Sequence, residues 1–449
     1  MNIPELYELY QQYPSVRTDT RKLQKDDLFF ALKGPNFNAN AFAEAAIANG
    51  AAYAIIDDAA YAHITGTILV DDALETLQRL ALFHRNQLDI PFIAITGSNG
   101  KTTTKELTHA VLSASYKTYT TAGNLNNHIG VPLTILSIRK DAEMAIIEMG
   151  ASHQGEIAGY CNYTLPTHGL ITNCGKAHLE GFGSFEGVKK AKGELYDHLR
   201  NNNGTAFVMW DYDYLRTMSR GISRIVAYSA MDHHANQKDP ASPASQGSSS
   251  IEPSIIGEAL QSEAYLQALV RKGLTGERLI RSRLVGAYNL PNILAALTIG
   301  KYFKVDEEKM IKALEDYNPS NSRSQLIEKG GYRIILDAYN ANPSSMRAAI
   351  ENFRQIETEN KMLVLGAMAE LGADSLKEHQ HIIDLIRQHP WKEVILVGGD
   401  FVKLNPPFRT FNDAAEAGKW LKSHSSGNAY LLIKGSRSAG MEKALEELF

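Results

Sequence analysis

The sequence predicts an α/β protein of three domains, with a central P-loop parallel-sheet domain and a C-terminal Rossmann-like domain. Short apolar runs alternate with helical segments along most of the chain, which is typical of parallel sheets covered by helices on both faces. One run, residues 92–96, leads directly into a glycine-rich turn ending in Lys101 and Thr102. At 449 residues the chain is too long for one ordinary core, so we expect domains at 1–88, 89–318 and 319–449.

The first domain is predicted from two apolar strands and two helices. Residues 28–32 and 52–56 are short apolar runs that indicate strands, and the alanine-rich segment 41–49 indicates a helix between them. Residues 74–87 form an amphipathic helical pattern, which ends before Pro91 at the entry to the second domain.

The second domain should contain the parallel sheet. Its expected strands are residues 92–96, 144–148, 169–172 and 205–209, with helical segments between them. Residues 230–256 are dominated by Ser, Pro, Gln and Ala, a composition that buries too little apolar surface to order itself. We therefore expect a flexible surface insertion there.

The third domain repeats the strand and helix alternation. A helix is expected over residues 344–355. The expected strands are residues 333–337, 361–365, 393–397 and 429–433.

Composition and charge narrow the class of function. The chain is 44% hydrophobic and 21% charged, as in globular proteins, and its net charge of −4 gives no field that would recruit nucleic acid or an anionic membrane. No stretch approaches the roughly 18–20 apolar residues of a membrane span. The N-terminus lacks signal-peptide features, and Cys161 and Cys174 have no metal-like spacing. We expect a cytoplasmic monomer with two buried thiols, no membrane insertion and no nucleic-acid partner.

The glycine-rich turn indicates a site for a nucleoside triphosphate. Gly97 and Gly100 permit a tight turn whose backbone N–H groups face phosphate oxygens, and the helix that follows adds its positive end. Lys101 would reach the β- and γ-phosphates, and the Thr102 hydroxyl would bind Mg²⁺. The usual pattern has a second glycine five residues before Gly100, where this chain has Ile95, so the loop is a contracted form. The alternative is an ordinary surface turn that happens to contain a lysine.

Five further clusters are ambiguous when each is taken alone. Glu148 ends an apolar strand at the sheet edge where ligands bind, although strand-end glutamates without such a role are as common. His178 could be a metal ligand or a histidine satisfied by its neighbours. Asp337 could bind ribose hydroxyls or cap a helix. Residues 123–132 could be a generic polar loop, and the basic run 189–192 a solvated helix face that gives no reason to choose Lys192.

Taken together and in this order, the clusters resemble the bacterial Mur ligases. Residues 96–103 look like the phosphate loop of that family, which folylpolyglutamate synthases share. Residues 339–344, 365–372 and 434–442 are similar to the branch that adds D-alanyl-D-alanine. Residues 18–21 and 27–34 resemble its N-terminal UDP-sugar domain. The resemblance covers nearly the whole chain apart from residues 230–256.

The resemblance implies an ATP-dependent amide ligase of peptidoglycan precursor synthesis. Such an enzyme activates the carboxylate of UDP-MurNAc-tripeptide as an acyl phosphate and then joins it to D-Ala-D-Ala. The small-molecule partners would be these two substrates, and the cofactors ATP and Mg²⁺ at two sites. Lys192 matches the lysine that the family carbamylates.

The resemblance also gives the ambiguous residues roles. The implied catalytic residues are Lys101, Glu148, His178 and Lys192, of which the last three, with Thr102, would hold metal. The implied ATP-binding residues are Gly97, Ser98, Asn99, Gly100, Lys101, Thr102, Thr103, Asn289, Arg323 and Asp337. The implied substrate-binding residues are Thr18, Asp19, Thr20, Arg21, Asn126, Asn127, Thr172, Asn173, Asn340, Asn342, Lys434 and Ser436.

Some positions depart from the family pattern. Tyr288 stands where His is common, Leu336 where a second Asp is frequent, and Ser322 where Gly is common. Residues 38–40 replace a typical Asp-Gly-His. These differences concern nucleotide and uridine contacts and leave the phosphate loop intact.

Two alternatives remain open from the sequence. One is another amide ligase of the same group, which adds a single amino acid to a UDP-MurNAc precursor or glutamate to folate. The other is a nucleotide-dependent regulatory protein without ligase chemistry, although no segment resembles a switch region.

Overall fold

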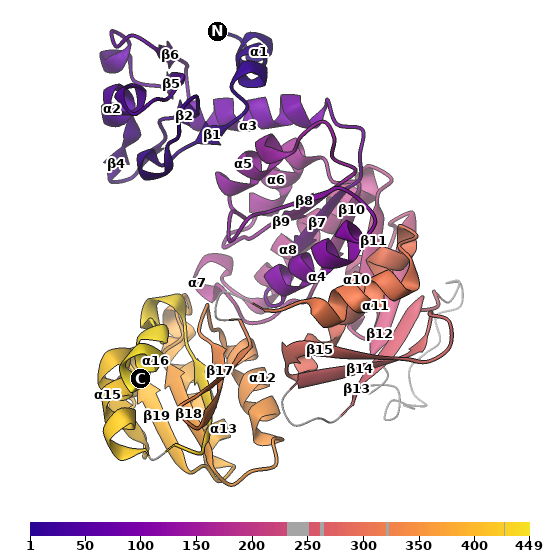
Figure 1. Ribbon diagram of the computed structural model, residues 1–449, viewed down its shortest axis with the longest axis vertical. Coiled ribbons are helices and arrows are strands. Elements are labelled where there is room, and N and C mark those ends of the chain that lie inside the picture. The colour runs from indigo at the N-terminus through magenta and orange to yellow at the C-terminus, as the bar shows by residue number, and fades with distance from the viewer. Residues whose placement is uncertain (231–250, 261–264, 320–322, 426) are drawn as a thin grey trace.

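The computed structural model describes residues 1–230, 251–260, 265–319, 323–425 and 427–449. The chain forms three lobes, each built around its own sheet (Figure 1). The predicted α/β class is confirmed. No helix among the described residues is long and apolar enough to cross a membrane.

The N-terminal lobe holds a four-stranded parallel sheet in the order β1-β2-β5-β6. Helix α3 (Ala73–Arg85) packs on α1, α5 and α6 and so joins this lobe to the central one (Figure 1). The remaining elements are α1 (Ile3–Gln12), β1 (Val16–Arg17), β2 (Leu28–Phe30), β3 (Lys33–Gly34), β4 (Phe37–Asn38), α2 (Ala43–Ala48), β5 (Tyr53–Ile56) and β6 (Thr67–Leu69).

The central sheet has the strand order β15-β14-β13-β12-β11-β10-β7-β9-β8 among the described residues. Its strands are β7 (Phe92–Thr96), β8 (Thr118–Thr120), β9 (Met144–Glu148), β10 (His168–Ile171), β11 (Thr205–Met209), β12 (Arg224–Ala230), β13 (Ile255–Leu260), β14 (Tyr265–Lys272) and β15 (Arg278–Val285). Its helices are α4 (Lys101–Ser113), α5 (Gly130–Ser137), α6 (Glu156–Thr164), α7 (Leu179–Phe182), α8 (Phe185–Asn201), α9 (Asp213–Met218), α10 (Leu290–Tyr302) and α11 (Glu307–Asp316).

Two expectations for this lobe need correction. The sheet is parallel from β8 to β13, but β14 and β15 extend it by antiparallel pairing, and β12 to β15 were not anticipated. The expected insertion 230–256 is wrong at its ends, because Ala230 closes β12 and residues 255–256 open β13. Residues 231–250 of that expectation lie outside the described residues.

The C-terminal lobe has a six-stranded sheet in the order β16-β17-β21-β18-β19-β20, parallel except for β16. Its strands are β16 (Gln325–Lys329), β17 (Tyr332–Asp337), β18 (Lys361–Gly366), β19 (Glu393–Val397), β20 (Arg409–Phe411) and β21 (Tyr430–Lys434). Its helices are α12 (Pro343–Arg354), α13 (Ser375–Arg387), α14 (Gly399–Lys403), α15 (Ala414–His424) and α16 (Glu442–Leu448).

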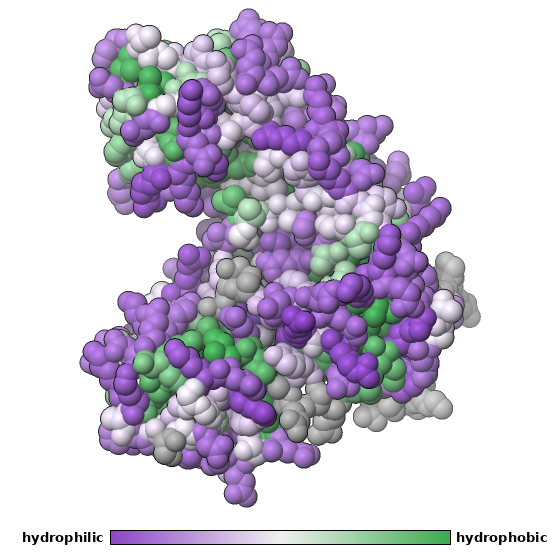
Figure 2. Space-filling model, viewed as in Figure 1, coloured by the Kyte–Doolittle hydropathy of each residue, from purple (hydrophilic) through white to green (hydrophobic). Residues whose placement is uncertain are grey.

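The buried strands of the central sheet leave the loops that follow them as the accessible segments where a site can form. Strands β7, β9 and β11 of the central sheet are wholly buried, with apolar side chains on both faces. In parallel sheets the loops after the strands gather at one edge. The surface is mostly hydrophilic on the side shown and indented between the N- and C-terminal lobes (Figure 2).

Candidate active site

The phosphate loop lies between β7 and α4. Gly97 and Gly100 have φ values of 144° and 78°, which side chains disfavour. A Cβ on Gly97 would also lie 2.0 Å from the Thr172 hydroxyl oxygen. The shortened glycine-rich loop therefore fits a tight turn that packs directly against Thr172, just after the end of β10.

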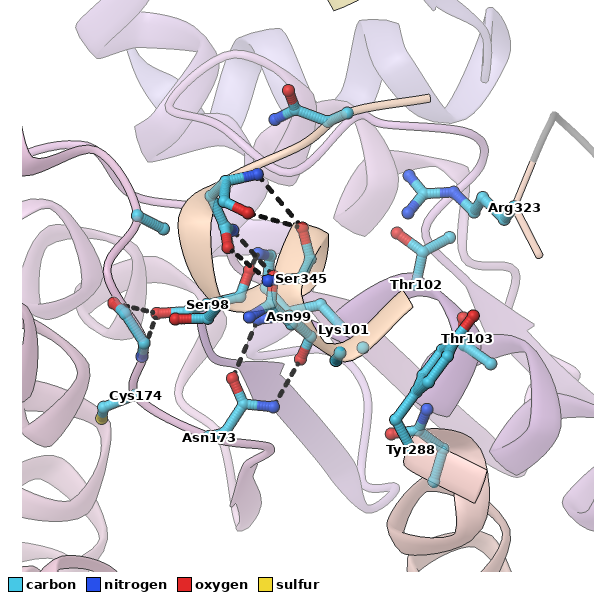
Figure 3. Close-up of a pocket in the computed structure, with 18 of the residues that line it drawn as sticks. Ser98, Asn99, Lys101, Thr102, Thr103, Asn173, Cys174, Tyr288, Arg323 and Ser345 are labelled. Carbon is cyan, nitrogen blue, oxygen red and sulfur yellow. Dashed lines mark hydrogen bonds between the residues drawn. The ribbon is translucent and has the colours of Figure 1, made fainter. Parts of the chain in front are cut away.

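Residues after β10 hold this loop from behind. The Thr172 hydroxyl donates to the Asn99 carbonyl at 2.6 Å. The Asn173 side chain bonds both the N–H and the carbonyl of Asn99 at 3.0 and 3.1 Å (Figure 3). The Ser98 N–H donates to the Asn173 carbonyl at 2.9 Å. Thr172 and Asn173, which the resemblance placed in the substrate channel, here fix the shape of the phosphate loop.

Lys101 opens helix α4 and folds over the same turn. Its Nζ donates to the carbonyl of Gly97 at 2.7 Å, so the amine sits where the loop encloses space for phosphate. Burial lowers the pKa of Lys101, and the charge of Glu148 partly opposes that effect. An anion bound in the loop would satisfy this amine.

Glu148 ends β9 with only 1% of its surface exposed. Its Oε1 accepts from the Thr102 hydroxyl at 3.1 Å and from the Asn126 amide at 2.7 Å. Among the described residues its Oε2 is buried without a hydrogen-bond partner, and Nζ of Lys105 lies 4.0 Å away. A buried carboxylate oxygen that lacks a partner fits a cation, and the hydroxyl of Thr102 beside it is a suitable oxygen ligand for Mg²⁺.

Lys105 is a functional neighbour that the sequence did not single out. It is 2% exposed, and its Nζ donates to the Thr121 carbonyl at 2.8 Å. The Thr121 hydroxyl in turn accepts the N–H of Glu148. Its position one helical turn after Lys101 on α4 was the available signal, because residues i and i+4 share a helix face.

His178 and Lys192 lie on either side of helix α7. His178 has a φ of 51°, and its Nδ1 is 2.7 Å from Oε2 of Glu370, a residue of the C-terminal lobe. Lys192 on α8 is 1% exposed, and its Nζ donates to the Ala151 carbonyl at 3.3 Å. Burial, followed by the charge of Lys101, lowers the pKa of Lys192 to about 7.

Lysines of the basic run 189–192 lie on different faces of helix α8. Lys189 forms an exposed-side pair with Glu186 at 2.7 Å, whereas Lys192 points into the lobe. Within the described residues, no three His, Cys, Asp or Glu side chains converge as a ready-made metal centre. A metal at Glu148 would therefore complete its ligands with oxygens from a bound phosphate or water.

The C-terminal lobe supplies the facing wall. Lys434 at the end of β21 donates to Asp337 at the end of β17 over 2.5 Å, and the other oxygen of Asp337 accepts the Ser324 N–H at 3.1 Å. The Arg323 guanidinium stacks 3.6 Å from the centre of the Tyr339 ring. Asp337 and Lys434, expected to meet different substrates, are paired with each other.

Contacts between the two lobes hold the facing wall beside the phosphate loop. The Asn342 amide caps α12 and donates to Oδ1 of Asn99 at 2.7 Å. The Tyr288 hydroxyl and the Ser324 hydroxyl lie 2.9 Å apart. Tyr288, which departs from the family pattern, is thus part of the link between the lobes. In the view of Figure 3, Thr102 and Thr103 lie between Arg323 and Tyr288.

These walls enclose a cavity of about 960 Å³, large enough for a nucleotide and part of a second substrate. The expected site residues that line it are Ser98, Asn99, Gly100, Lys101, Thr102, Thr103, Asn126, Asn127, Glu148, Asn173, His178, Asn289, Arg323, Asp337, Asn340, Asn342 and Lys434.

The other expected residues lie outside this lining. Gly97, Thr172 and Lys192 sit behind the loop or α7, and Ser436 bonds the Ala367 carbonyl at 2.6 Å. Residues 18–21 lie in the N-terminal lobe, where Asp19 pairs with Arg21 at 2.9 Å. Lining residues without a prior role include Glu370, Tyr339 and the stacked pair Tyr212 and Tyr214. They come from loops that only the fold brings together.

Comparison with known proteins agrees with this geometry. Residues 95–300 match the Mur ligase middle domain, and residues 322–445 match the family described as Mur ligase, glutamate ligase domain. The UDP-N-acetylmuramoyl-tripeptide–D-alanyl-D-alanine ligase of Bacillus subtilis is 33% identical, covering 96% of this chain and 92% of the relative.

Solved structures show the same arrangement of lobes. A crystal structure of MurF from Acinetobacter baumannii superposes with a TM-score of 0.84 at 30% identity, covering 98% of this chain and 97% of that one. The MurF ligase of Thermotoga maritima, solved in complex with ADP, has a TM-score of 0.80 at 25% identity and 96% coverage of both chains.

Proposed function

The chain belongs to the Mur ligase family, and from that premise we propose that it joins D-alanyl-D-alanine to UDP-N-acetylmuramoyl-tripeptide. The products are UDP-MurNAc-pentapeptide, ADP and phosphate, in peptidoglycan precursor synthesis. The observation that carries the proposal is the single cavity in which Lys101, Thr102 and Glu148 face Asp337 and Lys434 from another lobe. One wall is built for phosphate, and the other can present a second substrate beside it.

The chemistry needs an activated carboxylate. An oxygen of the tripeptide carboxylate attacks the γ-phosphorus of ATP, and the bond from that phosphorus to the β,γ-bridging oxygen breaks. ADP departs, and the tripeptide becomes an acyl phosphate. The dipeptide ammonium first loses one proton to solvent, and the resulting neutral amine attacks the acyl carbon. Phosphate leaves with the bonding electrons, and the nitrogen loses a second proton to give the amide. Lys101 and the N-terminus of α4 hold the phosphates and offset the charge that moves onto them.

Thr102 and Glu148 would hold Mg²⁺, because Glu148 keeps a buried oxygen that accepts no hydrogen bond from the described part of the chain, beside the Thr102 hydroxyl. The ion would supply charge neutralisation at the phosphate oxygens. His178 would serve a second ion, together with Lys192 once carbamylated. The lowered pKa of Lys192, about 7, supports that modification, since a neutral amine is the form that reacts with CO₂.

The division of labour among the domains is part of the proposal. We assign UDP-sugar binding to residues 1–88, with Thr18 to Arg21 among its contacts, ATP binding to residues 89–318 and dipeptide binding to residues 319–449. Water must be kept from the acyl phosphate, so the C-terminal lobe should close further on the central one when substrates bind. The hydrogen bond from the Asn342 amide to Asn99, at 2.7 Å, already joins the two lobes.

Phosphate release from ATP tests the function directly. Release with UDP-MurNAc-tripeptide should require D-Ala-D-Ala and yield a pentapeptide product that mass spectrometry detects. A substrate panel covers the runner-up, an amide ligase for a single amino acid. Turnover that depends on folate or on a lone amino acid, and not on the dipeptide, would replace the proposal.

A further inference from the structure

Glu370 is a cavity carboxylate that the reaction outlined above does not use. It lies in the loop after β18, lines the active-site cavity, and reaches across the lobes to Nδ1 of His178 at 2.7 Å. Its side chain is about half exposed (54%), so a ligand can reach it. Residues in direct contact with both a cavity and a neighbouring lobe are well placed to bind substrate during closure.

The loop that carries Glu370 is held in one shape. The Met368 N–H donates to Nε2 of the buried His379 at 3.0 Å. The Ala367 carbonyl accepts from both the hydroxyl and the N–H of Ser436, at 2.6 and 3.1 Å. Glu370 itself has a φ of 62°, which is disfavoured for a residue with a side chain and persists only where the surroundings impose it. The surrounding hydrogen bonds thus hold Glu370 in a disfavoured backbone conformation, which fixes the position of its carboxylate.

The other acidic side chains of the cavity have partners or an assigned role: one oxygen of Glu148 is the candidate ligand for a cation. Among the described residues these side chains are Glu148, Glu156 and Asp337. Glu148 accepts from Thr102 and Asn126, and Asp337 is paired with Lys434. One oxygen of Glu156 accepts the N–H groups of residues 152 and 153 at 2.6 and 2.7 Å.

Glu370 has acceptor capacity left, because a carboxylate offers about four lone-pair positions. Its ion pair with His178 is the only one it makes within the described parts of the chain. Glu370 lines the same cavity as Lys101, the lysine that grips the ATP phosphates.

We propose that Glu370 binds the ammonium group of the incoming D-Ala-D-Ala and holds that nitrogen beside the acyl phosphate. This inference rests on the proposed function and names the residue that recognises its amine substrate. In water the dipeptide is a zwitterion with an N-terminal ammonium group. That group has three N–H donors, which a carboxylate with free acceptor positions can bind. Glu370 belongs to the lobe that is expected to deliver the dipeptide, and it faces the lobe where the acyl phosphate forms.

Glu370→Gln is the main test, with KM measured separately for each substrate. Loss of a charge-assisted hydrogen bond should raise the KM for D-Ala-D-Ala by about 10- to 100-fold. The KM values for ATP and UDP-MurNAc-tripeptide should stay within about twofold, and Glu370→Asp should recover part of the loss. Glu378→Gln is the matched control, because Glu378 also bridges the lobes, through Lys176 at 2.5 Å, but does not line the cavity.

A half reaction separates this proposal from the function beneath it. Tripeptide-dependent positional isotope exchange in ATP, measured without dipeptide, should be the same in wild type and Glu370→Gln. Propionyl-D-alanine, which lacks the ammonium, should inhibit wild type more weakly than D-Ala-D-Ala binds, and the variant should lose that preference. An unchanged dipeptide KM, or equal effects in Glu378→Gln, would overturn the role of Glu370. Absence of exchange in wild type would instead overturn the ligase function.

Discussion

The two walls of the active-site cavity are built in different ways. The wall from the central lobe is fixed by buried and part-buried hydrogen bonds within that lobe, such as those of Asn173 to the phosphate loop and of Thr102 to Glu148. The wall from the C-terminal lobe meets it through contacts that each include a partly exposed side chain, among them His178 with Glu370 and Lys176 with Glu378. The first wall is preorganised for phosphate, while the second is free to approach and withdraw.

This difference predicts how the molecule responds to perturbation. Buried polar networks are costly to break, because a group left without its partner stays desolvated. Exposed pairs contribute roughly 0–1 kcal/mol each. Changes in the central wall should therefore act strongly on reactivity, rate or stability, and changes in the contacts between lobes weakly.

The largest expected effect concerns access to the central wall. Burial raises the pKa of the Cys174 thiol to about 12, so at pH 8 almost none of it is the reactive thiolate. We expect alkylation of native Cys174 to be about 1,000-fold slower than after unfolding in urea. Because the pKa is raised, the native rate should keep rising with pH beyond 9. Mass spectrometry of iodoacetamide-treated protein measures both rates.

Fast native modification of Cys174 would show that the central wall opens readily and would weaken the contrast between the walls. Cys161 is the internal reference, since it is 1% exposed, has a similarly raised pKa and lies away from the cavity lining. Rapid reaction of both thiols would indicate opening of the whole lobe, and rapid reaction of Cys174 alone an opening at the site.

Lys101→Ala should lower kcat about 100- to 1,000-fold, the loss typical of removing one preorganised group that stabilises transition-state charge. Within the described residues its amine bonds only carbonyls of its own loop, so the melting temperature should change little. Phosphate release and calorimetry measure the two effects. A variant that retains near-normal kcat would contradict the role of Lys101 in gripping the γ-phosphate.

Lys105→Met should destabilise the protein by about 3 kcal/mol, because removing one partner leaves the buried charge of Glu148 uncompensated. Urea unfolding measures the change. Lys189→Met in the same lobe is the control, since its pair with Glu186 is exposed and should cost less than about 1 kcal/mol. Equal losses in both variants would mean that Lys105 does not act as the counter-charge of Glu148.

The same contrast explains what could be predicted from sequence. The phosphate loop and Glu148 are contiguous with apolar strands, and the strands predicted at 92–96, 144–148, 205–209 and 393–397 coincide with β7, β9, β11 and β19. Features confined to one strand and its following loop carry their own signal in composition and spacing.

Features that depend on two segments meeting were not readable. Lys105 and Lys192 are selected by the face of a helix that packs inward, and Glu370 by the approach of another lobe. Strands β14 and β15 pair only with each other and with β13, which begins inside a stretch whose composition indicated an insertion. A pattern of single residues does not state which segment will lie beside it.

The smallest effect is expected at the pair between Lys176 and Glu378. Lys176 is 46% exposed, and the buried Glu378 keeps a second partner in His381 at 3.7 Å, so Lys176→Met should raise substrate KM values no more than about fivefold and leave kcat nearly unchanged. The difference from wild type should fade at 1 M salt, because exposed charges are screened there.

Small-angle scattering should show the wild-type radius of gyration shrinking when an ATP analogue and UDP-MurNAc-tripeptide are added. If Lys176→Met abolished both the shrinkage and the activity, the C-terminal wall would be locked by this pair, and the two walls would be equally rigid.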